Sequence, residues 1–174
     1  MNSLRQYITE KLILKRGIDR HAYHPKDKDE LQNLIKDLIK ERGNDADLND
    51  IDVSNVTNMS FLFKKSTFNG DISKWDVSNV KTMESMFANS KFNGNISDWD
   101  VSKVENMGYM FCMSDFNGNI SKWNVSNVTN MKYMFLYNSK FNGDISSWNV
   151  SDTDMTKMFS NCPLEKNPPK WYKK

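Results

Sequence analysis

The chain is poor in the residues that carry most enzyme chemistry. It has two histidines, His21 and His24, and two cysteines, Cys112 and Cys162. The histidines precede the repeated part of the chain and the cysteines lie within it, so no histidine is expected beside a cysteine to activate it. The histidine pair also lacks the further ligands of a zinc site. We therefore expect no enzyme activity, no catalytic residue, no metal site and no cofactor.

Long apolar segments and an excess of one charge sign are also missing. No run approaches ~18 consecutive apolar residues, so no membrane insertion is expected. The net charge of +2 predicts no affinity for nucleic acid. Charges interrupt the first apolar stretch, and no signal peptide or anchor is recognised. These absences favour a cytoplasmic or virion-associated location over the cell surface, and a monomer unless the chain is part of an assembly.

Internal repetition is what the chain has in abundance. Steps of 24 residues separate Trp75, Trp99 and Trp123, and aligned columns of phenylalanine and of Asn-Gly pairs follow the same period. A fixed period of this length indicates repeats that stack on one another. The tryptophan column is Trp75, Trp99, Trp123 and Trp148, the phenylalanine column is Phe63, Phe87, Phe111, Phe135 and Phe159, and the Asn-Gly pairs begin at Asn69, Asn93, Asn117 and Asn142.

Each repeat predicts a short strand followed by a short helix. Ile72, Trp75 and Val77 have the apolar spacing of a leucine-rich-repeat strand, and residues 80–87 carry apolar residues at the spacing of one helical face. The Asn-Gly pair predicts a tight turn with a residue at positive φ. The expected fold class is therefore an α/β repeat: a leucine-rich-repeat solenoid of about five turns, each with a strand and a short helix or 3₁₀ turn. The expected helix N-caps are Asn58, Thr82, Asn106, Asn130 and Asp154.

Three segments are expected: an α-helical N-terminal cap over 1–46, the solenoid over 47–164, and a C-terminal capping tail over 165–174. In the first segment, Asp27 and Glu30 resemble a capping box, and Gly43 follows an apolar stripe as a helix terminator. An earlier helix is indicated by Leu4, Tyr7, Ile8 and Leu12. The N-terminal helices either shield the first turn or dock on a partner. The stripe is Leu31, Leu34, Ile35, Leu38 and Ile39.

The pattern Phe-Asn-Gly-Asp/Asn-Ile-Ser-x-Trp-Asp/Asn-Val-Ser-Asn-Val-x-x-Met-x-x-Met-Phe covers roughly residues 48–164. It resembles the BspA-like leucine-rich repeats, which also occur in mycoplasma-type surface lipoproteins. This resemblance implies a bacterial or phage protein that acts as a binding module, because relatives are largely surface or secreted proteins that bind other proteins. The chain departs from these relatives in lacking a signal peptide, a lipobox cysteine and a wall anchor.

The inward columns are the expected core, and the outward strand positions are the expected binding face. On that face, Asp52, Asp76 and Asp100 lie in one column, where they could either coordinate a cation such as Ca²⁺ or accept hydrogen bonds from nearby backbone and serine groups. The predicted core is Trp75, Trp99, Trp123, Trp148, Phe87, Phe111 and Phe135. The candidate protein-binding face is Asp50, Lys74, Asp76, Asp98, Asp100, Lys122, Asn124, Ser147 and Asn149.

The most variable outward column alternates in charge: Asp50, Lys74, Asp98 and Lys122. It is either a self-neutralising solvated surface or the recognition face of a repeat scaffold. The sequence therefore predicts a non-catalytic protein-binding module that binds its partner on the outward strand face. The alternative is a structural or assembly component, such as a virion or envelope-associated protein, that docks through its N-terminal helices.

Overall fold

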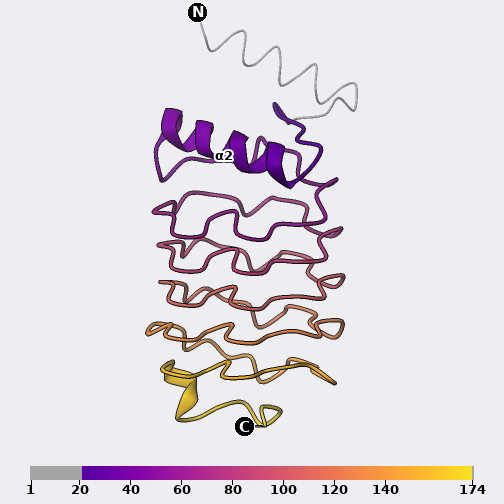
Figure 1. The fold of residues 1–174 in the computed structure, drawn as a ribbon, viewed down its shortest axis with the longest axis vertical. Helices are drawn as coiled ribbons and strands as arrows, with labels where there is room; N and C mark the ends of the chain where they lie inside the picture. The colour runs from indigo at the N-terminus through magenta and orange to yellow at the C-terminus, as the bar shows by residue number, and fades with distance from the viewer. Residues whose placement is uncertain (1–20, 174) are drawn as a thin grey trace, which may run out of the picture.

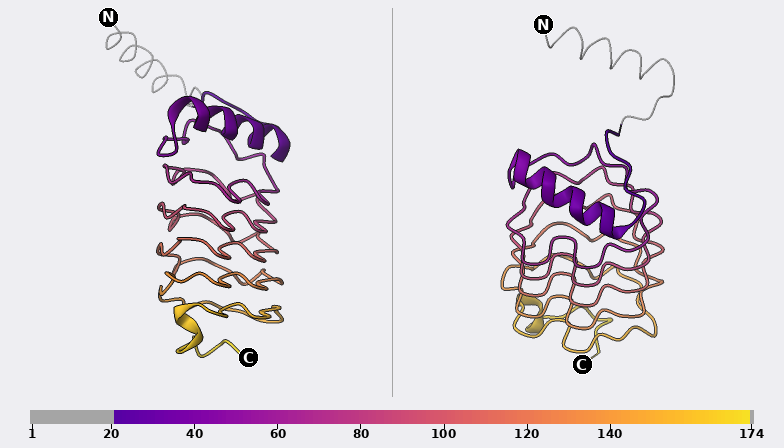
Figure 2. Two further views of the ribbon diagram at one scale, coloured as in Figure 1. Left: turned by 60° about the vertical axis from the view of Figure 1, so that its left-hand side comes forward. Right: turned by 45° about the horizontal axis from the view of Figure 1, so that its top comes forward.

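The repeats coil into turns that stack along one axis, with helix α2 at one end and the last turn at the other (Figure 1). The computed structural model describes residues 21–173. Helix α2 (Lys28–Arg42) lies across the N-terminal end of the stack, and the 3₁₀ helix η1 (Pro163–Glu165) lies at the C-terminal end, as two further views show (Figure 2). The earlier helix predicted around Leu4 and Leu12 falls outside the described residues.

The turns contain neither the strands nor the helices that the repeat pattern predicts. Between residues 21 and 173 the structure has α2, η1 and six isolated parallel bridges, but no sheet. The prediction of an α/β leucine-rich-repeat solenoid, with a strand and a short helix in each repeat, is therefore wrong. The expected N-cap residues form bridges instead, as in the pairs Asn58–Thr82 and Thr82–Asn106.

A ladder between neighbouring turns replaces the predicted helix. The backbone N–H groups of Met83, Ser85 and Phe87 donate to carbonyls of the next turn at 2.9, 2.9 and 3.0 Å, and that of Asn89 does so at 2.7 Å. An α-helix would direct these same groups to carbonyls within its own turn. Because the ladder uses every second N–H group in this segment, the chain cannot also form the predicted helix here.

Alternating backbone conformations make this ladder possible. Ser85 and Asn89 have φ of 53°, and the N–H of Met86 donates to the carbonyl of Met83 at 3.1 Å. A tight turn closed in this way often places its third residue at positive φ. A non-glycine residue there costs roughly 1–2 kcal/mol. The positions equivalent to these two are Phe61, Lys65, Tyr109, Met113, Tyr133, Tyr137, Lys157 and Asn161, all at positive φ.

The Asn-Gly pairs have a different role from the one predicted. Gly43 is the glycine with positive φ in the described part of the chain, so the expected positive φ at the Asn-Gly pairs is wrong. Gly70 is required instead by close approach, because a Cβ there would lie 2.0 Å from the carbonyl oxygen of Ala46. The asparagine side chains link successive turns: Oδ1 of Asn69 accepts from the N–H of Asn93 at 2.7 Å.

The tryptophan and phenylalanine columns fill the interior of the stack. Trp99 is 4% exposed, and its indole Nε1 donates to the carbonyl of Ile72 in the preceding turn at 3.2 Å. Trp171 in the C-terminal tail continues this column, donating to Ile145 at 2.9 Å. The phenylalanine rings stack turn on turn, as for Phe87 and Phe111 at 5.7 Å. The other buried members of the predicted core are Trp75, Trp123, Trp148 and Phe135.

Helix α2 has the boundaries that its sequence signals indicate. Oδ1 of Asp27 accepts from the N–H groups of Asp29 and Glu30 at 2.9 and 3.0 Å, and Gly43 ends the helix at φ 91°. The apolar stripe faces the stack: Leu31, Ile35 and Leu38 are buried in the same core cluster as the first turn, and Leu34 and Ile39 pack against it. Helix α2 thus covers the N-terminal end of the apolar interior.

Replacing Trp99 with alanine removes a buried ring and its hydrogen bond to Ile72. We expect Trp99→Ala to lower the free energy of unfolding by about 3–5 kcal/mol, measured by chemical denaturation. Lys122→Ala, on an exposed side chain, should change it by less than about 0.5 kcal/mol. An unchanged denaturation midpoint for Trp99→Ala would contradict the inward placement of this column.

Two adjacent lysines test the cost of positive φ. Lys65 has φ of 59°, whereas Lys64 is not at positive φ, and both side chains are exposed. Glycine relieves the left-handed strain but loses more chain entropy, so Lys65→Gly should raise the free energy of unfolding by up to about 1 kcal/mol. Lys64→Gly should lower it by about 0.5–1 kcal/mol. Equal effects of both changes in denaturation experiments would argue against strain at residue 65.

Candidate functional site

The predicted binding face is exposed to solvent, but its charges do not pair across the turns as expected. Lys74, Asp98 and Lys122 are exposed, and no ion pair joins them in the described structure. Asp50 is half-buried and receives two hydrogen bonds from Arg42 of α2, at 3.0 and 3.1 Å. The remaining members of this face, all exposed, are Asp76, Asp100, Asn124, Ser147 and Asn149.

The aspartate column of that face binds its own backbone. Oδ1 of Asp100 accepts from the N–H of Ser102 at 3.0 Å, an Asx turn that bends the chain at the corner of the repeat. The side chain and N–H of Ser102 lower the pKa of Asp100 from its usual value, because both favour the charged carboxylate. Asp52 and Asp76 make the same contact to Ser54 and Ser78, and Asn124 makes it to Ser126. A carboxylate and an amide serve equally well in this turn.

The groups that could support catalysis or metal binding are dispersed. Cys112 and Cys162 are free and buried, and burial raises the pKa of each thiol, which disfavours the nucleophilic thiolate. Nδ1 of His24 lies 3.4 Å from Oδ2 of Asp52. Within residues 21–173, no three His, Cys, Asp or Glu side chains gather closely enough to hold a metal ion. None of the helices in that span is long and apolar enough to cross a membrane.

A second exposed surface was not predicted from the sequence. Tyr109 is 38% exposed, and Met113 and Tyr137 are each 53% exposed. The ring of Tyr109 stacks on that of half-buried Tyr133 in the next turn, with centroids 4.7 Å apart. In the first turn, Phe61 is also exposed and carries the ammonium groups of two lysines over its ring, at 5.0 and 5.4 Å. We call Phe61, Tyr109, Met113, Tyr133 and Tyr137 the aromatic row.

All members of the aromatic row have positive φ. They occupy the two left-handed positions of the Met-x-x-Met-Phe segment. In other repeats the first position holds Ser85 or Lys157, and the second holds Lys65, Asn89 or Asn161. Asparagine tolerates this conformation better than an aromatic residue does. The sequence does signal this surface, because the residue type varies strongly at these two positions. The prediction of a helix, however, places both positions on an ordinary polar helix face.

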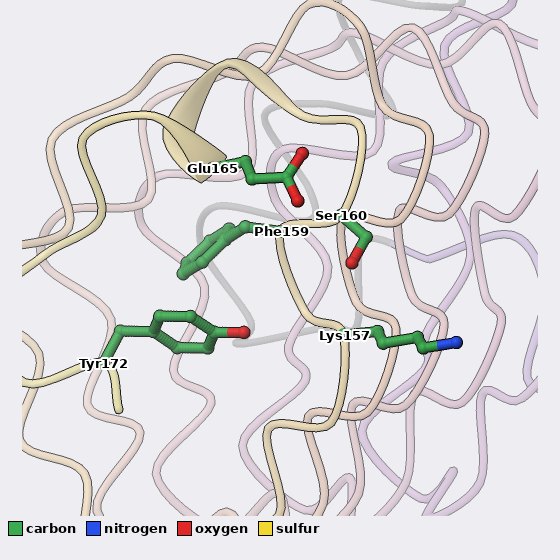
Figure 3. Close-up of a pocket in the computed structure, with 5 residues that line it drawn as sticks. All are labelled: Lys157, Phe159, Ser160, Glu165 and Tyr172. Atoms are coloured by element: carbon green, nitrogen blue, oxygen red, sulfur yellow. The ribbon is translucent and has the colours of Figure 1, made fainter. Parts of the chain in front are cut away.

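Two hollows lie at the C-terminal end of the stack. The first, of about 240 Å³, is lined by Lys157, Phe159, Ser160, Glu165 and Tyr172, with the Tyr172 ring beside that of Phe159 (Figure 3). The second, of about 510 Å³, shares Lys157 and Tyr172 with the first. Together they extend along the open edge of the last turn. The other residues that line the second hollow are Thr153, Asp154, Met155, Thr156 and Lys173.

The geometry defines a protein of stacked repeats with two exposed lateral surfaces and an open C-terminal edge. Two overlapping stretches, residues 30–115 and 92–173, match the family described as Mycoplasma protein of unknown function, DUF285. The chain therefore belongs to this family, with the repeated part and most of α2 inside the match. No curated protein and no solved structure matches the chain.

The Asx turns predict a specific response to acid. The pKa values of Asp71 and Asp100 are lowered in the folded state, so their contribution to stability is present above the ordinary value of 3.8 and is lost as the pH falls through the lowered pKa. Asparagine keeps the turn without titrating. The double variant Asp71→Asn, Asp100→Asn should match the parent at pH 7 and lose less stability than the parent below about pH 4.

Thermal melts across this pH range, measured by circular dichroism, test the prediction. Asp98→Asn is the matched control, because this carboxylate makes no hydrogen bond to another described residue, and it should melt like the parent at each pH. Asp100→Ala, which removes the acceptor, should be less stable at pH 7. A double variant with the acid sensitivity of the parent would show that these carboxylates do not contribute.

Proposed function

We propose that the protein is a non-catalytic binding module whose partner is another protein, and that the aromatic row is the centre of the binding surface. The observation that carries the proposal is the placement of large exposed side chains at strained positions. Tyr109, Met113 and Tyr137 each combine positive φ with an exposed fraction above one third. Other repeats carry small or polar residues at these two positions, such as Ser85 and Asn89, whereas here large side chains that do not serve the core stand there, which favours a role in recognition.

The chemistry of the row suits a protein surface. Tyrosine and methionine are enriched in protein interfaces, and tyrosine offers a large rigid contact area together with a hydroxyl group. The stacked pair Tyr109 and Tyr133 is already ordered by its ring contact, so less side-chain entropy is lost on binding. The near-balance of charges supports a protein partner over nucleic acid.

The charged face is the second candidate for the same function. Lys74, Asp98 and Lys122 are exposed without direct ion pairs among the described residues, so these charges are available to a partner. Exposed charges contribute more to association rate and specificity than to affinity, whereas buried aromatic anchors dominate affinity. The aromatic row is therefore the first choice. In this proposal α2 acts as a cap, since it buries its apolar stripe on the stack.

The resemblance to BspA-like repeats supports the same class of function. The relatives that it implies are largely proteins that bind other proteins. The alternative, an assembly role through the N-terminal helices, gains less support, because the apolar stripe of α2 already packs against the first turn.

Matched surface variants test the proposal. A partner recovered from the native host with the parent protein would be identified and purified, and its affinity measured by titration calorimetry. We expect the variant Tyr109→Ser, Met113→Ser, Tyr137→Ser to bind at least about tenfold more weakly. Its melting temperature should fall only slightly, because the side chains are exposed and only the stacking of Tyr109 on Tyr133 is lost.

The charge-reversal variant Lys74→Glu, Asp98→Lys, Lys122→Glu is the control and should retain affinity at physiological salt. Loss of affinity in the control alone would move the site to the charged face. Undiminished binding by both variants would contradict protein recognition through either lateral surface.

A further inference from the structure

The Asn-Gly pairs share a local sequence but differ in how their side chains are held. Asn69 and Asn142 both stand in the sequence Phe-Asn-Gly-Asp-Ile-Ser, and both are exposed. Oδ1 of Asn69 accepts from the N–H of Asn93 in the next turn at 2.7 Å, and the same contact recurs at Asn93 and Asn117, at 2.7 and 3.0 Å. The side chain of Asn142 makes no hydrogen bond to any residue between 21 and 173.

The path of the chain after the last turn explains this difference. Glu165 follows Leu164, which stands where the earlier repeats have the phenylalanine of the Phe-Asn-Gly sequence, so its N–H is the expected donor to Asn142. The chain enters the 3₁₀ helix η1 here, and the N–H of Glu165 donates to the carbonyl of Cys162 at 2.9 Å instead. Asn142 is therefore left without the donor that the other three asparagines have.

The surroundings of Gly143 are also the most open of the four pairs. A Cβ added at Gly143 would lie 3.8 Å from the carbonyl oxygen of the preceding glycine, whereas at Gly70 it would lie 2.0 Å from that of Ala46. The N–H of Gly143 has no acceptor among residues 21–173. Asn142 and Gly143 line a polar hollow of about 440 Å³, so both are accessible to water.

We propose that Asn142 is a site of covalent modification, at which the side-chain amide is converted to a carboxylate without an enzyme. The backbone nitrogen of Gly143 gives up its proton to a base in solution and attacks Cγ of Asn142. The new N–Cγ bond closes a succinimide ring, the Cγ–Nδ2 bond breaks, and Nδ2 leaves as ammonia. Water then opens the ring to aspartate or isoaspartate. Glycine permits ring closure because it has no Cβ to obstruct it.

The hydrogen bond to the next turn protects the other asparagines. For Asn69 to react, Cγ must turn toward the nitrogen of Gly70, and this movement breaks the contact to Asn93. One hydrogen bond of ordinary strength corresponds to about fivefold in rate. The reaction at Asn142 adds a negative charge to the hollow that Asp144 also lines, and isoaspartate lengthens the backbone at the residue whose N–H binds Asn117.

The test compares Asn142 with Asn69 in the same full chain. Protein kept folded at mildly alkaline pH is sampled over time and digested with trypsin, which separates the two sites into peptides 141–157 and 66–74. Mass spectrometry gives the rate at each site, and the same measurement in urea gives their ratio without the fold. We expect the ratio of the Asn142 rate to the Asn69 rate to be at least about fivefold higher in the folded protein. A ratio that is the same or lower in the folded protein would overturn the proposal.

A change of the neighbouring glycine tests the chemistry. Gly143 is not at positive φ, and the closest atom to an added Cβ is a ring carbon of Phe141 at 3.1 Å, so Gly143→Ala leaves the backbone conformation accessible. This variant should lose the fast reaction at Asn142 and keep the slow reaction at Asn69. An unchanged rate at Asn142 would contradict attack by the backbone nitrogen, and the rate ratio of the parent decides the matter if Gly143→Ala fails to fold. The site shares no residue with the aromatic row and does not depend on the proposed function.

Discussion

Backbone hydrogen bonding between successive turns is the interaction on which the rest of the structure depends. In the Met-x-x-Met-Phe segments before the last turn, alternate N–H groups bind carbonyls one turn further along the chain. Forming this row requires positive φ at two non-glycine residues in every turn. The interior offsets that cost, because each turn adds buried aromatic, methionine and aliphatic side chains to a continuous column.

The side-chain hydrogen bonds follow from the same stacking. Each tryptophan donates to a carbonyl of the preceding turn, as Trp123 does to Ile96 at 3.1 Å, so the indole that fills the interior also ties the turns together. The Asx turns at Asp71 and Asp100 hold the corners in place. The side chains of Asn69, Asn93 and Asn117, from the first three Asn-Gly pairs, accept from the backbone of the next turn. The buried columns, the corner turns and the ladder thus recur at the same positions of each turn. Each of these positions needs the same type of residue, so one sequence pattern recurs along the chain.

The same geometry generates the aromatic row proposed for binding. Positive φ places Tyr109, Met113 and Tyr137 on the outside of the turns, while the neighbouring Met and Phe side chains remain inside. A ladder directed along one axis must also end with unused donors at its last turn, unless another group supplies acceptors. Glu165 supplies one, which accepts from the N–H of Asn161 at 2.9 Å.

The sequence by itself determined the period, the inward columns of Trp99 and Phe111, and α2 with its start at Asp27, because burial and capping depend on local residue type and spacing. It could not determine the backbone of the turns. The spacing of Met83, Met86 and Phe87 suits one face of a helix, yet it suits equally a segment with alternating backbone conformations. Only the neighbouring turn decides between the helix and the alternating backbone. Its carbonyls accept hydrogen bonds from N–H groups that, in a helix, would donate to carbonyls of the same segment. The exposed aromatic row was therefore decided by the tertiary structure, because it exists only once the turns have stacked.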